Sequence, residues 1–97
     1  MFTRPTPAVF PTHAGRVAVV TGAGRGIGQS FCHRLAERGA IVVGVDIGSL
    51  DETAAIVEAA GAKFMPIAAD ISSQTETASL GAKVAAEFGR CDILINN

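Results

Sequence analysis

The chain has 97 residues, of which 48% are hydrophobic and 18% are charged, and its formal net charge is −1. This length suits one small domain, and this composition excludes a disordered or fibrous chain. Because acidic and basic side chains nearly balance, we expect no nucleic-acid partner and no membrane partner. The chain contains no tyrosine, which excludes any mechanism that needs a tyrosine of this chain as acid or base.

The first part of the chain changes from a proline-rich segment to a regular alternation of apolar runs. Residues 1–15 hold three of the four prolines and are predicted to form a flexible N-terminal arm. Residues 16–21 are apolar and rich in β-branched side chains, which is typical of a strand buried on both faces. Apolar residues at steps of four predict a helix over residues 27–38. A second buried strand is predicted over residues 41–45, with Asp46 at its end.

The second part of the chain contains two capping boxes, each a Ser followed three residues later by Glu, at Ser49 and at Ser73. They predict helices over residues 49–60 and 73–88, each followed by a glycine. The two remaining apolar runs, residues 63–69 and 92–95, are predicted to be strands.

Strands and helices therefore alternate, which predicts an α/β fold with right-handed crossovers and a parallel sheet. Pro66 lies within the third predicted strand, although proline cannot donate to the hydrogen-bond ladder of a central strand. A doubly wound, Rossmann-type sheet in the order 3-2-1-4 places this strand at the edge. We predict this order for the four strands, with three helices, in one domain over residues 16–97.

Four of the eleven glycines lie in residues 21–28, hereafter the glycine loop, where the first strand meets the first helix. Small residues here let the backbone turn tightly and approach a pyrophosphate, which faces free N–H groups and the positive helix end. Asp46 ends the next strand 18 residues after Gly28, close to the spacing of about 20 expected for a carboxylate that binds the adenosine ribose. The pattern predicts a dinucleotide site.

The glycine loop has the spacing Thr-Gly-x-x-x-Gly-x-Gly. Together with Asp46, the pair Asp70-Ile71 and the segment Asp-Ile-Leu-Ile-Asn-Asn over residues 92–97, it resembles the short-chain dehydrogenase/reductase family over residues 16–97. No Cys-x-x-Cys motif or Cys/His cluster suggests a metal site, and the catalytic residues of the family cannot be placed in this chain. The resemblance implies cofactor-binding roles for Gly22, Arg25, Gly26, Ile27, Gly28, Asp46, Asp70, Ile71 and Asn97.

The resemblance also implies how these residues divide the cofactor between them. The glycine loop would hold the pyrophosphate and the adjoining ribose, and Asp46 would bind the adenosine ribose. Asp70 and Ile71 would border the adenine. Asn97 would line the cofactor cleft by its backbone, and Asn96 would brace the neighbouring strands. Because Asp46 would repel a 2′-phosphate, we expect NAD rather than NADP as the cofactor.

In the family that this sequence resembles, a serine, a tyrosine and a lysine in the later half of the chain complete the chemistry. We therefore expect this chain to be the N-terminal, cofactor-binding portion of an NAD(P)-dependent oxidoreductase and to be inactive alone. The resemblance implies a small alcohol or carbonyl substrate and a homo-oligomer for the whole protein. No secretory signal is visible, which predicts a cytoplasmic location.

Two other functions stay open from the sequence. One is a stand-alone nucleotide-binding or non-catalytic module, and the other is a Rossmann-type methyltransferase, which also places an acidic residue after its second strand. The glycine spacing and the Asn96-Asn97 pair favour the oxidoreductase over the methyltransferase. Cys32 and Cys91 are expected to be free thiols, buried or half-buried, and not a disulfide or metal ligands.

Overall fold

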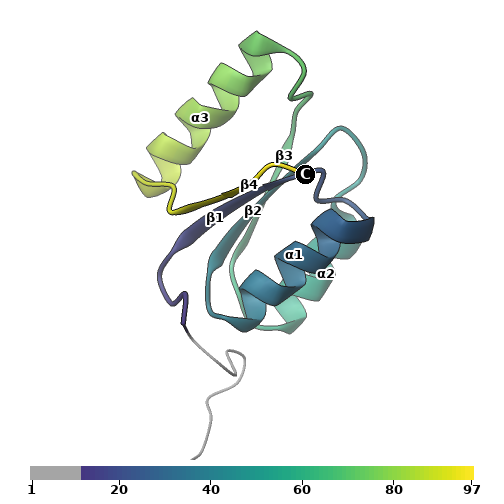
Figure 1. The fold of residues 1–97 in the computed structure, drawn as a ribbon, viewed down its shortest axis with the longest axis vertical. Helices are drawn as coiled ribbons and strands as arrows, with labels where there is room; N and C mark the ends of the chain where they lie inside the picture. Colours follow the sequence, from purple (N-terminus) through teal and green to yellow (C-terminus); the bar gives the residue numbers. More distant parts are fainter. Residues whose placement is uncertain (1–11) are drawn as a thin grey trace, which may run out of the picture.

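The computed structural model describes residues 12–97, in which strands and helices alternate (Figure 1). The strands are β1 (Val17–Thr21), β2 (Ile41–Asp46), β3 (Phe64–Ala68) and β4 (Ile93–Ile95). The helices are α1 (Gly26–Glu37), α2 (Asp51–Ala59) and α3 (Gln74–Phe88). Of the predicted arm, residues 1–11 lie outside the described residues, and residues 12–15 form a turn. No helix within residues 12–97 is long and apolar enough to cross a membrane.

The strands form one parallel sheet in the order β3-β2-β1-β4, which confirms the predicted fold class and strand order. Val19 of β1 lies between Val43 of β2 and Leu94 of β4. Pro66 of β3 pairs with Gly44 of β2. Within residues 12–97 β3 is an edge strand, and no strand pairs with its other side. The missing N–H of Pro66 therefore removes no hydrogen bond to a second neighbouring strand.

The helices cover the two faces of the sheet unequally, because α1 and α2 lie together on one face and α3 lies alone on the other (Figure 1). All five residues of β1 are buried, as expected for a central strand with helices on both sides. Its alternate side chains join two different cores. Val17 and Val19 pack with Leu80 and Val84 of α3, while Val20 packs with the α1 and α2 side chains.

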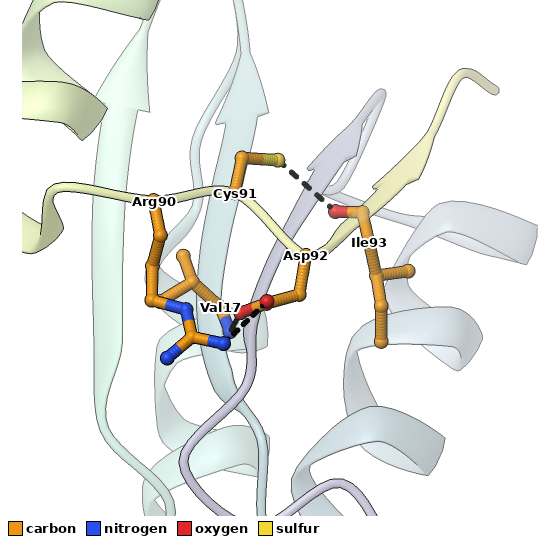
Figure 2. Close-up of polar contacts among 5 residues, drawn as sticks. All are labelled: Val17, Arg90, Cys91, Asp92 and Ile93. Atoms are coloured by element: carbon orange, nitrogen blue, oxygen red, sulfur yellow. Dashed lines mark hydrogen bonds and ion pairs between the residues drawn. The ribbon is translucent and has the colours of Figure 1, made fainter.

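The start of β4 is held beside the start of β1 by a cluster around Asp92 (Figure 2). The backbone N–H of Val17 donates to Asp92 Oδ2 at 2.8 Å, and the N–H of Asp92 donates to the carbonyl of Val17 at 2.9 Å. Arg90 Nη2 lies 2.6 Å from Asp92 Oδ1. The bond from Arg90, followed by that from Val17, lowers the pKa of Asp92 below its usual value. This anchor fixes the register that brings the end of β4 to the glycine loop.

The two predicted capping boxes differ in the structure. Ser73 caps α3, since its Oγ accepts from the N–H of Glu76 at 3.3 Å. The Glu76 carboxylate does not return to Ser73 but accepts from the N–H of Asp70 at 2.9 Å. It therefore closes the loop between β3 and α3.

The predicted capping role of Ser49 is wrong. The N-cap of α2 is Leu50, and no side chain caps this helix. Ser49 Oγ instead accepts from the N–H of Asp51 at 3.2 Å, in a turn that precedes the helix. Leu50 is buried in the core beneath α1 and α2, and its burial sets the start of the helix one residue later than the serine pattern indicates.

The two cysteines have different surroundings. Cys32 is buried in α1 and is free, as expected, and burial raises the pKa of its thiol to about 12. Cys91 is also free, but the expectation that it is at least half-buried is wrong. It lies on the exposed connection from α3 to β4, where its Sγ is 3.4 Å from the carbonyl oxygen of Ile93 (Figure 2).

Candidate functional site

The glycine loop crosses the edge of the sheet where the parallel strands end, between the end of β1 and the start of α1 (Figure 1). In doubly wound sheets this carboxyl edge is where ligands bind. The end of β2 and the end of β4 lie on either side of β1 at this edge. Side chains that follow three strands can therefore meet at one place.

Three glycines of the loop occupy positions where the structure favours glycine, two by their backbone conformation and one by close packing. Gly22 has a φ of +63°, a backbone conformation that other residues rarely adopt. Gly26 has a φ of +61°, and a Cβ there would meet no protein atom within 4 Å, so its backbone faces open space. Gly28, the third, is buried, and a Cβ at this position would collide with the carbonyl oxygen of Gly22. The start of α1 thus packs directly on the backbone of the loop.

Asp46 joins the end of β2 to the glycine loop. Its Oδ2 accepts from the N–H of Gly24 at 2.8 Å, and its Oδ1 accepts from the N–H of Gly48 at 2.9 Å. These two bonds, Gly48 first, lower the pKa of Asp46, and the nearby Arg25 lowers it further. The carboxylate is therefore ionised at neutral pH. Gly24 has no room for a side chain, because a Cβ would lie 2.9 Å from Asp46 Oδ2.

Asp46 and the glycine loop border an open pocket of about 540 Å³, hereafter the acidic pocket. It is lined by Gly24, Arg25, Asp46, Ile47, Gly48, Ser49 and Glu52. The pocket thus brings together two predicted site residues, Arg25 and Asp46. It also includes Glu52, which the sequence pattern indicated only as part of a helix start.

A buried hydrogen bond from a side chain of α2 holds the backbone of the glycine loop. Thr53 is fully buried, and its Oγ1 donates to the carbonyl of Ala23 at 2.7 Å. Gln29 Nε2 of α1 lies 3.1 Å from Thr53 Oγ1, 3.3 Å from the carbonyl oxygen of Gly24 and 2.9 Å from Glu52 Oε1. Its two N–H groups are shared among these three acceptors. Sequence reasoning missed these residues. The available signal was a threonine at a buried helical position, where a hydroxyl needs a partner.

Asn97 lies against the other side of the loop. Its backbone N–H donates to Thr21 Oγ1 at 3.0 Å, and its side-chain Nδ2 donates to the carbonyl of Gly22 at 3.3 Å. The Thr21 hydroxyl lies within hydrogen-bond distance of the carbonyl of Ile95 and of Asn96 Oδ1. The end of β4 and the start of the glycine loop are therefore one hydrogen-bonded unit.

The structure does not bring the remaining predicted site residues into the acidic pocket. Asp70 is exposed after β3, and its Oδ1 accepts from the hydroxyl of Ser72 at 2.6 Å and from its N–H at 2.9 Å, which lowers the Asp70 pKa. Ile71 borders a groove of about 500 Å³ between α3 and β4. Ile27, in the first turn of α1, is 67% exposed.

Comparison with known proteins identifies the family. The model of the short chain dehydrogenase family matches residues 16–97. The chain belongs to this family. Among its curated relatives is the 2-dehydro-3-deoxy-D-gluconate 5-dehydrogenase of Dickeya dadantii (strain 3937), which is 45% identical over 83 residues, or 86% of this chain and 33% of that protein. The chain spans about a third of the length of the curated relatives it matches.

Solved short-chain dehydrogenases have the same fold and differ in their cofactor. A metagenomic short-chain oxidoreductase in complex with NADP has a TM-score of 0.81 and 39% identity, over 86% of this chain and 38% of that one. Carveol dehydrogenase of Mycobacterium avium in complex with NAD has a TM-score of 0.79 and 30% identity, over 87% and 35%. Structural neighbours in this family thus bind a nicotinamide dinucleotide of either kind. The assignment to this family favours an oxidoreductase over a methyltransferase.

Proposed function

We propose that residues 16–97 form the NAD-binding part of a short-chain oxidoreductase that interconverts a small alcohol and the corresponding carbonyl compound. One observation carries the proposal. The Asp46 carboxylate ends β2, accepts a hydrogen bond from the N–H of Gly24 in the glycine loop, and borders an open pocket with Arg25. For the whole protein we propose a cytoplasmic homo-oligomer.

The glycine loop fits a pyrophosphate on the evidence of its own geometry. Gly26 leaves open space where other residues carry a Cβ, and Gly28 lets α1 begin directly against the loop. The backbone N–H groups at the start of α1 and the positive end of the helix attract a phosphate. Gly22 and Ile27 complete this segment in the proposal, and Asn97 lines the cleft by its backbone. When bound, the dinucleotide supplies the hydride acceptor or donor.

In this proposal, residues at the end of β2 and after β3 bind the adenosine ribose and the adenine. Asp46 would accept hydrogen bonds from the two free hydroxyls of the adenosine ribose, for which its ionised carboxylate is suited. Asp70 and Ile71 would border the adenine, and their exposure after β3 leaves them accessible to it.

The charge of the acidic pocket supports NAD as the preferred cofactor. NADP would bring a phosphate with close to two negative charges next to Asp46. Two unit charges 4 Å apart interact by about 4 kcal/mol at an effective dielectric constant of 20, and solvent at an open pocket reduces this value. A remaining repulsion of about 1.4 kcal/mol still gives a tenfold preference. Arg25 offsets part of this repulsion.

The test compares the affinities of the chain for NAD and NADP by calorimetry. We expect the wild type to prefer NAD, and Asp46→Asn, which keeps one oxygen acceptor and loses the charge, to reduce the preference about tenfold. Glu58→Gln, which removes a carboxylate from an exposed position of α2 outside the pocket, is the control. A wild type that prefers NADP, or a preference that Asp46→Asn leaves unchanged, would contradict the proposal.

A further inference from the structure

Glu52 is the second acidic side chain of the acidic pocket. It lies in the first turn of α2, one residue before the buried Thr53. It therefore belongs to a different element from Asp46, which ends β2. A glutamate at an exposed helix start has no fixed position unless another group holds it. In this structure another group does hold it.

Gln29 of α1 fixes the Glu52 carboxylate at the pocket. The Gln29 Nε2 donates to Glu52 Oε1 at 2.9 Å. The same nitrogen lies 3.1 Å from the buried Thr53 hydroxyl and 3.3 Å from the carbonyl of Gly24. A neutral amide donor therefore holds the carboxylate next to the glycine loop and leaves its negative charge uncompensated.

The charged side chains that line the acidic pocket are one cation, Arg25, and two carboxylates, Asp46 and Glu52. Their formal charges sum to one negative charge, whereas those of Arg25 and Asp46 alone would cancel. A ribose with a free 2′-hydroxyl meets no charge penalty there. A 2′-phosphate carries close to two negative charges and would be repelled by the net negative charge of the pocket.

We propose that Glu52 is a specificity-determining residue, which acts with Asp46 to exclude dinucleotides that carry a 2′-phosphate. This inference rests on the proposed function, because it concerns the same pocket. Gln29 is the positioning residue that keeps the carboxylate of Glu52 at the pocket.

The experiment measures the affinities of the chain for NAD and for NADP by calorimetry, in the wild type and in Glu52→Gln. We expect Glu52→Gln to tighten NADP binding about fivefold, the effect of one exposed charge pair, and to leave NAD binding nearly unchanged. The difference should shrink at high salt, because exposed charges are screened. Glu58→Gln, the same change farther along α2, should alter neither affinity. Glu52→Lys should favour NADP further than Glu52→Gln does.

The outcomes separate this inference from the proposed function. If Asp46→Asn lowers the preference for NAD and neither Glu52 variant does, Glu52 is not a determinant and the proposed function stands. If the Glu52 variants weaken NAD and NADP equally, the residue has only a structural role and the inference is overturned. If the wild-type chain binds neither dinucleotide, the proposed function fails and the inference fails with it.

Discussion

The side chain of Thr53 connects α2 to the backbone of the glycine loop by a buried hydrogen bond. It is fully buried, and its hydroxyl both donates to the carbonyl of Ala23 and accepts from Gln29. A valine has nearly the same shape but no hydroxyl. Its introduction would leave the carbonyl of the buried Ala23 without this partner, and that loss costs more than the bond itself contributes.

We therefore expect Thr53→Val to lower the free energy of unfolding by about 1–3 kcal/mol, the penalty for an unpaired buried polar group. Urea denaturation followed by circular dichroism measures this change. Thr75→Val, the same substitution at an exposed position of α3, is the control and should change stability by less than about 0.5 kcal/mol. Equal effects of the two substitutions would show that the Thr53 hydroxyl does not brace the loop.

The stabilisation that Asp92 contributes where β4 joins β1 should depend on pH. The pKa of Asp92 is lowered by the bonds from Arg90 and Val17, so the folded state favours the ionised carboxylate. The resulting stabilisation is present above the usual aspartate range, about pH 4, and is lost as the pH falls through the lowered value. We expect Asp92→Asn to reduce the urea midpoint at pH 7 and to have progressively less effect in acid. Glu87→Gln, which removes an exposed carboxylate of α3, is the control substitution. A difference between Asp92→Asn and wild type that is constant with pH would contradict this account.

At the scale of the helices, two glycines in helical positions should respond to alanine in opposite ways. A Cβ at Gly28 of α1 collides with the Gly22 carbonyl, whereas a Cβ at Gly81 of α3 meets no protein atom within 4 Å. Gly28→Ala should destabilise the fold by about 1–3 kcal/mol through overpacking. Gly81→Ala should stabilise it by about 0.5–1 kcal/mol, because alanine is the better helix former.

Thermal unfolding of both glycine variants beside the wild type tests this prediction, and each variant is the control for the other. A stabilising Gly28→Ala would mean that α1 does not rest on the loop. A destabilising Gly81→Ala would mean that the exposed side of α3 contacts something at that position.

The elements were largely predictable because apolar spacing is a local signal. Steps of four residues identified α1 and α3, and the doubly wound strand order placed the strand that contains Pro66 at the edge of the sheet. The start of α2 was misplaced at Ser49, because the burial of Leu50 in the tertiary core decides it. Local patterns do not contain that information.

The candidate site was predictable to the extent that one chain segment contains it. The glycine spacing and Asp46 could be read from the sequence, and the structure joins them by a hydrogen bond. The contact among Glu52, Thr53 and Gln29 could not, because it forms between α1 and α2, although a buried threonine in a helix indicates that its hydroxyl has some partner. That contact depends on how the two helices pack, which no spacing within either helix specifies.

At the scale of the whole molecule, we expect the described residues to provide the cofactor site of the proposed function but not the tyrosine acid that the resemblance to the family implies. The sequence contains no tyrosine. We expect the chain to bind NAD and yet to produce no change in NADH absorbance with a panel of alcohols and ketones. A preparation without the protein is the blank, and calorimetric NAD binding is the check that the chain is folded. Turnover above the blank would show that other residues of this chain supply the proton.

The union of the glycine loop with the end of β4 has a consequence for the order of folding. The bond from Asn97 to Thr21 joins residues 76 positions apart, whereas Asp46 and Gly24 are 22 apart. Distant segments meet more slowly than near ones, since closing a longer loop costs more entropy. The α1 and β2 side of the loop should therefore acquire protection from hydrogen exchange first. The contact between the end of β4 and the glycine loop should form last during folding and break first during unfolding.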